Sequence, residues 1–318
     1  MLKFRAYDFE NKEILLPDFL SFELQKEENV PADYLEVKFK SFANADNIKY
    51  IRLFYNDSLV FFGICDEILF SKDLTGAVVT LYFRNKMALL IDNEALPSEF
   101  NNITARVLFD KYIKQLGFKS FISDNKALTG KFIVEKGESV YDALYNFTRL
   151  NYSSAPYLVD EDTISFINNK NDDLYTLFSD GENADYQYRK IECSKFPCKL
   201  ISKINIKTSA NDYYKTVIKN DFALERGTQR ERYLDACNLV TSMSSAQKII
   251  NNSNNEFEEY KLYLDCLIFN SVYEKCSIAD YYLGNVENLY ISKVIIGSDI
   301  NGYYSKITLK KEEQYVVA

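Results

Sequence analysis

The stretch that decides the fold is Asp66-Glu-Ile-Leu-Phe-Ser-Lys-Asp-Leu-Thr-Gly-Ala-Val-Val-Thr-Leu-Tyr-Phe83. A second stretch, Lys293-Val-Ile-Ile-Gly-Ser-Asp-Ile-Asn-Gly-Tyr-Tyr-Ser-Lys-Ile-Thr-Leu309, repeats its pattern. Each has an apolar strand, then Asp, an aliphatic residue, a polar residue and Gly, and then a second strand. Alternating apolar residues around a Gly turn are typical of a β-hairpin. The repeat predicts one β-domain used twice.

The two stretches match position by position. Asp73 and Gly76 correspond to Asp299 and Gly302. Counting on from each glycine, the alternate positions of the second strand also correspond: Val79, Leu81 and Phe83 in the first stretch, and Ser305, Ile307 and Leu309 in the second.

Composition excludes several kinds of chemistry. The 318 residues suffice for two or three domains, and with 47 % hydrophobic residues substantial cores are expected. The chain has no histidine, which removes Ser-His-Asp and Cys-His catalysis and histidine-metal sites. We find no phosphate-binding loop, nucleotide fingerprint or clustered metal ligands. The sequence therefore predicts no catalytic, cofactor-binding or metal-binding residues, although a hydrolase using two carboxylates stays possible.

Charge and targeting features bear on partners and location. The formal net charge of −8 argues against nucleic-acid binding through a basic face. It fits a surface that repels DNA, such as the lining of a conduit, and equally an ordinary acidic surface. No signal peptide or bilayer-spanning stretch is evident, so we expect synthesis and folding in a reducing cytoplasm. Cys65 and Cys266 are predicted to be buried thiols.

Three regions are expected. Residues 1–97 alternate in the β period and predict a small barrel. Residues 98–172 predict an α/β unit, with a helix capped by Asn102 and ended by Gly117, and a second helix whose capping box is Ser139 and Asp142. Residues 173–318 predict a second barrel with a short helical insertion near 226–258, and the polar run 168–173 is the expected linker.

The order of these parts resembles the baseplate hub proteins of contractile phage tails and tailocins, the late-control-gene-D-like family. The residues that carry the resemblance are Val60-Phe-Phe-Gly-Ile-Cys-Asp-Glu67 and Tyr82-Phe-Arg-Asn-Lys-Met-Ala-Leu-Leu-Ile-Asp92. The closing segments Tyr290–Val294 and Asp299–Tyr303 also look like those of hubs.

The resemblance implies a fold and a structural role. It implies a β-rich α+β chain in which two antiparallel, tail-tube-like β-barrels flank a small LysM-like α/β insert. A homotrimer would then form a pseudo-hexameric ring between the tail tube and the central spike. Implied partners are the tail tube protein, the central spike protein, and baseplate wedge and tape-measure proteins, with no sequence-specific nucleic acid and no membrane insertion. The implied location is the virion or tailocin particle.

Two alternatives stay open at the level of sequence. The α/β unit could bind peptidoglycan, or the chain could be a cell-wall glycosidase that uses paired carboxylates. For the hub interpretation, the candidate assembly contacts are the hairpin residues Asp73, Gly76, Asp299 and Gly302, because hairpins that extend sheets could meet neighbouring rings.

Overall fold

The structure is a computed structural model that describes residues 1–74, 76–152, 155–167, 175–181, 184–207, 213–235 and 239–311. The chain divides into two compact units. Unit 1 comprises Met1–Asn171, Cys266–Ser271 and Val294–Tyr304. Unit 2 comprises Asp172–Asp265, Val272–Lys293 and Ser305–Ala318. The end of the chain is thus shared, because the tip of the C-terminal hairpin belongs to unit 1 and its base to unit 2.

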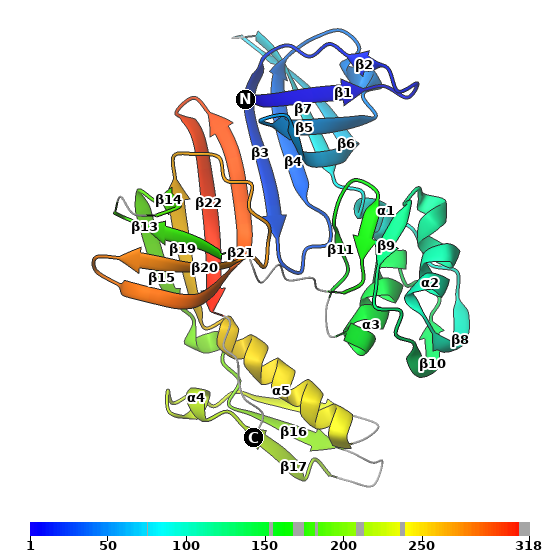
Figure 1. The fold of residues 1–318 in the computed structure, drawn as a ribbon, viewed down its shortest axis with the longest axis vertical. Coiled ribbons are helices and arrows are strands. Elements are labelled where there is room, and N and C mark those ends of the chain that lie inside the picture. The colour runs from blue at the N-terminus through cyan, green and yellow to red at the C-terminus, as the bar shows by residue number, and fades with distance from the viewer. Residues whose placement is uncertain are drawn as a thin grey trace. The chain divides into compact units, whose positions relative to one another are not determined.

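The β-sheet of unit 1 is built mainly from the first 84 residues (Figure 1). Its strands are β1 (Leu2–Tyr7), β2 (Glu13–Ile14), β3 (Phe19–Glu27), β4 (Tyr34–Lys40), β5 (Tyr50–Tyr55), β6 (Ser58–Asp73) and β7 (Gly76–Arg84). Hydrogen-bonded neighbours follow the order β3-β4-β7-β6-β5-β1-β2, and all of these pairs are antiparallel. The distal part of β21 (Gly284–Asp299) extends this sheet beside β3. The expected alternation is confirmed, since Leu35, Val37 and Phe39 are all buried.

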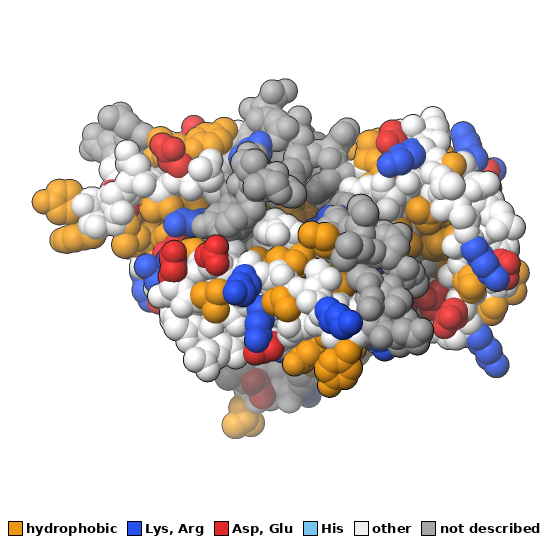
Figure 2. Space-filling view, turned by 90° about the horizontal axis from the view of Figure 1, so that it is seen from below, with side chains coloured by type: hydrophobic (Ala, Val, Ile, Leu, Met, Phe, Trp, Pro, Cys, Tyr) orange, Lys and Arg blue, Asp and Glu red, His pale blue; other side chains and the backbone are white. Residues whose placement is uncertain are grey.

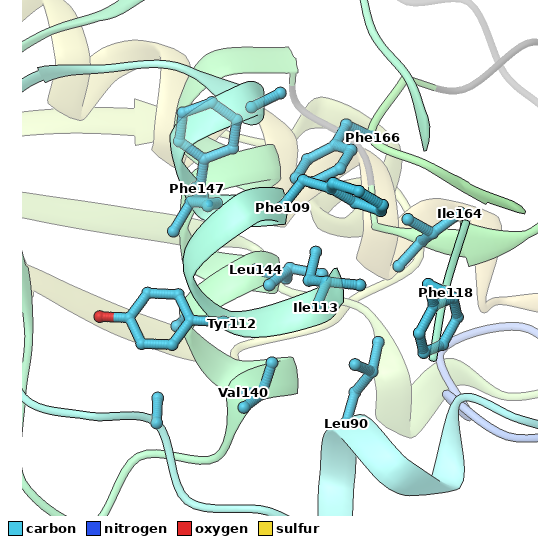
Figure 3. Close-up of a cluster of buried hydrophobic side chains, with 14 of the residues drawn as sticks. Leu90, Phe109, Tyr112, Ile113, Phe118, Val140, Leu144, Phe147, Ile164 and Phe166 are labelled. Carbon is cyan, nitrogen blue, oxygen red and sulfur yellow. The ribbon is translucent and has the colours of Figure 1, made fainter. Parts of the chain in front are cut away.

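An α/β segment follows within unit 1. Its helices are α1 (Ala88–Asp92), α2 (Ala105–Leu108) and α3 (Val140–Tyr152). Its strands are β8 (Ser98–Ile103), β9 (Ser120–Ile122), β10 (Leu128–Val134), β11 (Tyr157–Leu158) and β12 (Thr163–Ser165). They form one sheet of β10 and β8 and another of β11, β12 and β9. Buried aromatic and aliphatic side chains fill the space around α3, as Figure 3 shows.

One predicted helix cap in this segment is confirmed and one is wrong. Ser139 Oγ accepts a hydrogen bond from the Asp142 backbone N–H at 3.0 Å, and Asp142 Oδ2 accepts one from the Ser139 N–H at 3.0 Å, which is the predicted capping box. Asn102 does not cap α2: it has a φ of 55° and lies in β8. The cap is Thr104, whose hydroxyl accepts from the Val107 N–H. The observed cap lies two residues after the predicted one. β8 pairs with β10 and includes Asn102, so the helix begins only after this strand.

Unit 2 carries a second set of strands. They are β13 (Tyr175–Ser179), β14 (Tyr186–Gln187), β15 (Lys190–Lys195), β19 (Glu258–Leu264), β20 (Lys275–Asp280), the proximal part of β21, and β22 (Gly302–Lys311). Neighbours follow the order β14-β13-β20-β21-β22-β19-β15. β13 pairs in parallel with both β14 and β20, and the other printed pairs are antiparallel.

A small α/β layer interrupts this second set of strands. It contains β16 (Lys203–Lys207), β17 (Thr216–Lys219), β18 (Glu231–Asp235), α4 (Asp221–Leu224) and α5 (Leu239–Asn255). Its core comprises Ile201, Ile204, Ile206, Ala246 and Ile250. The helix expected within 226–258 is α5, and strands β16 and β17, from earlier in the chain, join the same sheet as β18. The expected linker 168–173 lies outside the described residues.

The described residues are mostly strands with few helices, which confirms the β-rich class. The prediction of buried thiols is wrong for Cys266, which is exposed, and Cys65 is half-buried. Cys266 lies two residues beyond Leu264, the last residue of β19, so the alternation of that strand does not reach it. None of the helices in the described part of the chain combines the length and apolar composition needed to cross a membrane.

Candidate assembly surface

The first hairpin turn is formed by the end of β6 and the start of β7. Asp73 is paired with Gly76 across the turn, and Asp73 Oδ1 accepts a hydrogen bond from the Gly76 N–H at 3.1 Å. Gly76 has a φ of 146°, a conformation that side chains with a Cβ resist. Leu74, inside the turn, is fully exposed at 107 %. The aspartate and the glycine therefore build the turn, and the leucine projects from it.

The second turn repeats this construction between β21 and β22. Asp299 Oδ1 accepts a hydrogen bond from the Asn301 N–H at 2.7 Å, and Gly302 has a φ of 110°. Ile300 is 99 % exposed, in the position that corresponds to Leu74. In both turns the aspartate accepts a backbone N–H from within the turn, and the aliphatic side chain is presented in the same way.

The correspondence continues into the strands that leave the turns. The matched positions are all buried: Val79, Leu81, Phe83, Ser305, Ile307 and Leu309. Each hairpin thus has the same inward-facing alternation after its glycine. The structure thus has a hairpin at each of the two expected places, and the predicted duplication of a β-domain stays a prediction.

The two turns lie toward the same end of the sheet of unit 1. The pairing of β4 with β7 reaches Lys40 and Val78 close to the first turn, so β4 ends and its antiparallel neighbour β3 begins there. β21 runs to its arrowhead toward the same end in Figure 1. An ideal Cβ on Gly297 would lie 2.7 Å from the carbonyl oxygen of Phe22, in the first half of β3. The second hairpin therefore packs closely on the strand that starts beside the first.

A hydrogen bond fixes this packing. The Tyr304 hydroxyl donates to Glu23 Oε2 at 3.0 Å. Burial, followed by this bond to a carboxylate, raises the pKa of Tyr304 well above its usual range, so the phenol stays protonated as the donor. Sequence reasoning missed Gly297, Tyr304 and Glu23, because their roles depend on a pairing between segments far apart in the chain.

A separate ionic cluster joins the α/β segment to the sheet of unit 1. The Arg52 guanidinium donates to both carboxylate oxygens of Glu161, at 2.6 and 3.0 Å. Lys86 Nζ lies 2.5 Å from Asp162 and 2.6 Å from the carbonyl oxygen of Gly117. Because Lys86 is almost completely buried, its charge needs these partners. Arg52 of β5 thus fastens the loop 160–162 to the sheet, and Lys86, in the turn between β7 and α1, fastens it to the start of the α/β segment.

Replacing Asp162 with Asn is expected to lower the free energy of unfolding by about 1–3 kcal/mol near pH 7, because buried Lys86 loses its anionic partner. Burial alone would raise the pKa of Asp162, but hydrogen bonds from Lys119 and Lys86 outweigh it and hold that pKa below 3.8. The contribution of the carboxylate is therefore present above pH 3.8 and is lost as the pH falls through the lowered pKa. Urea melts of both proteins from pH 7 to pH 3 should show a constant difference that shrinks only below about pH 4. A difference that already shrinks at pH 6 would contradict this assignment.

The described residues bring together no group of three or more potential metal ligands among Cys, Asp and Glu. Two carboxylates that do lie near one another, Asp66 and Asp92, both bind the Arg84 guanidinium, at 2.5 and 2.7 Å. Figure 2 shows basic and acidic side chains scattered among one another on the face it draws, with no large basic area among its described residues. Paired charges of this kind stabilise a surface and give no sign of a reaction centre.

Replacing Gly76 or Gly302 with Val is expected to lower the free energy of unfolding by about 1–3 kcal/mol each. The cause is backbone strain at positive φ, since no atom lies within 4 Å of either ideal Cβ. Replacing the neighbouring strand residue Ala77 with Val is the control, and it should be nearly neutral because strands favour β-branched residues. Thermal melts and incorporation into particles should be measured side by side, and we expect incorporation to fall more than stability. Normal incorporation of both variants into particles would show that the two hairpins are ordinary turns with no role in assembly.

Comparison with known proteins gives matches of structure only. No family profile matches the chain, and no curated protein sequence does. A tail protein from Neisseria meningitidis MC58 superposes with a TM-score of 0.78 at 14 % identity, covering 98 % of this chain and 96 % of that one. The 43 kDa tail protein of prophage MuSo2 from Shewanella oneidensis gives 0.77 at 14 % identity, covering 97 % and 98 %.

A third similar structure comes from a secretion apparatus. A component of the Escherichia coli type VI secretion system, described as similar to the phage T4 tail proteins gp27 and gp5, gives a TM-score of 0.58 at 12 % identity. The match covers all of this chain and 79 % of that one. The resemblance to baseplate hub proteins is thus confirmed at the level of fold. The chain has the fold shared by phage tail proteins and their relatives in type VI secretion.

Proposed function

We propose that the chain is a structural baseplate hub of a contractile phage tail or phage-tail-like particle. Three copies form a pseudo-hexameric ring that joins the tail tube to the central spike. The observation that carries the proposal is the fold match over nearly the whole length of two phage tail proteins. The chain thus acts as a component of the virion or tailocin particle, after synthesis in the bacterial cytoplasm.

Symmetry explains why the repeated hairpin supports this role. One chain carries two matched hairpins, so a three-fold ring would present six. Six similar elements can meet a six-fold tube on one side while the ring keeps three-fold symmetry for a spike. Proposed partners are therefore the tail tube, central spike, baseplate wedge and tape-measure proteins.

The proposed division of labour follows the three predicted regions. Residues 1–97 and 173–318 supply the two tube-like β-domains, and residues 98–172 act as a LysM-like spacer. The ion pair between Arg52 of β5 and Glu161 supports a spacer role, because it holds the segment against the sheet. The hub is proposed to be non-enzymatic, in keeping with paired carboxylates such as Asp66 and Asp92 that are occupied by Arg84.

Native mass spectrometry of the purified chain, alone and mixed with the tube and spike proteins of the same particle, tests the proposal. We expect a species of three times 37.0 kDa, alone or in the mixtures. A strict monomer in every mixture would overturn it. Clearing of a peptidoglycan zymogram by the chain would favour the glycosidase alternative, and retention on cell-wall sacculi would favour the glycan-binding one.

A further inference from the structure

We propose that Leu74 and Ile300 are the docking residues of the hub: the two side chains insert into apolar sockets on an adjacent ring built from a different protein. This inference rests on the proposed function and adds the residues and the chemistry of the contact. Both side chains are essentially fully exposed, at 107 % and 99 %. An isolated exposed aliphatic residue is ordinary, but here the same kind of residue occupies the same position in two turns.

Folding gives no reason for an aliphatic residue at these positions. Turn geometry comes from the aspartates, whose carboxylates accept backbone N–H groups, and from the glycines at positive φ. Short turns favour Gly, Pro, Asn, Asp and Ser, and a β-branched residue such as Ile is disfavoured. Both side chains are almost fully exposed to solvent in the described part of the chain, so we assign their burial to another molecule.

The surroundings of the two turns are also partly apolar. Phe70 on the outer part of β6 is 55 % exposed and Leu69 is 43 % exposed. Tyr303, directly after Gly302, is 48 % exposed. Each hairpin thus carries an exposed aliphatic residue in its turn and an exposed aromatic residue on one of its strands, although the two aromatic positions do not correspond. A complementary surface would be an apolar socket, with hydrogen-bonding groups at its rim for Asp73 and Asp299.

Position in the sheet makes the two tips act together. Both belong to unit 1 and both lie toward the end at which β3 begins. Because the second hairpin is packed on β3 through Gly297 and the Tyr304–Glu23 hydrogen bond, its tip is held by the sheet that continues to the first hairpin. Two side chains held by one sheet can bind the same neighbouring ring at the same time. Such bivalent binding is stronger than either contact alone.

The occupant is a different protein and not a second copy of this chain. In the proposed three-fold ring each chain makes one contact of each kind with a neighbouring copy, whereas the matched tips occur twice in every chain, so they fit a partner ring with twice as many equivalent sites. A ring of three hubs offers six tips, and a six-fold ring of another protein offers six equivalent sockets. In the proposed function that ring is the tail tube.

The test uses the full-length hub and the purified tube protein of the same particle. The variants are Leu74→Asp, Ile300→Asp and the double substitution, because aspartate suits a turn but does not suit an apolar socket. The matched control is Leu15→Asp, an aliphatic residue that is 92 % exposed and belongs to neither turn. Binding is measured by light scattering or surface plasmon resonance, with oligomeric mass and melting temperature recorded for every protein.

We expect each tip variant to bind the tube protein about tenfold more weakly and the double variant about a hundredfold more weakly. Oligomeric mass and melting temperature should match those of the unsubstituted hub, and Leu15→Asp should bind normally. If the unsubstituted hub is a trimer that binds the tube protein and the tip variants bind it equally well, the docking role of Leu74 and Ile300 is overturned and the proposed function is not. Loss of spike binding in place of tube binding would overturn the choice of partner. A hub that is monomeric and binds neither protein would overturn the proposed function together with it.

Discussion

Replacing Gly297 with Ala is expected to lower the free energy of unfolding by about 2–4 kcal/mol. Gly297 is buried in β21, and an ideal Cβ there would lie 2.5 Å from the ring of Tyr304 and 2.7 Å from the carbonyl oxygen of Phe22. A flexible side chain could give way, but Phe22 O belongs to the backbone of β3 and cannot move without disturbing the sheet. Because cores are packed as tightly as organic crystals, one methyl group is enough to force the two strands apart.

Urea denaturation of the Ala variant, compared with Gly181→Ala, checks this expectation. Gly181 has no positive φ, and its ideal Cβ would meet only Ser179 Oγ at an ordinary 3.5 Å. The control should therefore be close to neutral. Since the tip of the second hairpin is seated on β3 through Gly297, the variant should also lose the protection of the Tyr304 region against hydrogen exchange. Equal midpoints for the two variants would show that β21 is not packed against β3 in this way.

The sequence predicted those features of the fold that depend on local spacing. The alternation of Leu35, Val37 and Phe39, the capping box of Ser139 and Asp142, and both hairpins are visible within short windows. Period-two alternation says which residues share a face, and the burial of those residues follows from it. Asn102 shows the limit, because a capping residue two positions away from the true cap satisfies the same local pattern.

Long-range pairing could not be predicted in the same way. Alternation identifies β21 as a strand but does not say which strand lies beside it. The division of β21 between two units, with its tip next to β3, depends on how Gly297 and Tyr304 fit Phe22 and Glu23. The parallel pairing of β13 with β20 likewise joins residues 100 positions apart, such as Tyr175 and Lys275.

The candidate site was predicted in part. The turn residues Asp73, Gly76, Asp299 and Gly302 have the turn geometry that the sequence implied, and their role in assembly stays a prediction. The aliphatic residue of each turn was visible in the pattern, but its significance depends on full exposure, which only the structure shows. A polar residue in its place would have left the same turn and no reason to expect a partner.

Replacing Phe147 with Ala is expected to have the largest effect of a single substitution in the α/β segment, about 3–5 kcal/mol. Phe147 is fully buried on α3, and its ring meets those of Phe132, Tyr152 and Phe166 at centroid distances of 6.2, 5.8 and 6.0 Å (Figure 3). Removing the ring deletes these edge-to-face contacts and leaves a cavity that the surrounding rings fill only in part. The control is Tyr145→Ala on the exposed face of the same helix.

Thermal melts and limited proteolysis of the two variants distinguish unfolding of the α/β segment from unfolding of the rest of the chain. In the Phe147 variant, cleavage should appear first within residues 98–152, and the Tyr145 variant should resist protease like the unsubstituted protein. The oligomeric mass of the same samples then bears on the proposed spacer role. If the segment only separates other parts of the proposed hub, a destabilised segment should leave the proposed trimer intact, because that proposal assigns assembly to the hairpins and the β-sheets. Loss of the trimer at a temperature where the rest of the chain stays folded would mean instead that the segment itself forms part of the subunit interface.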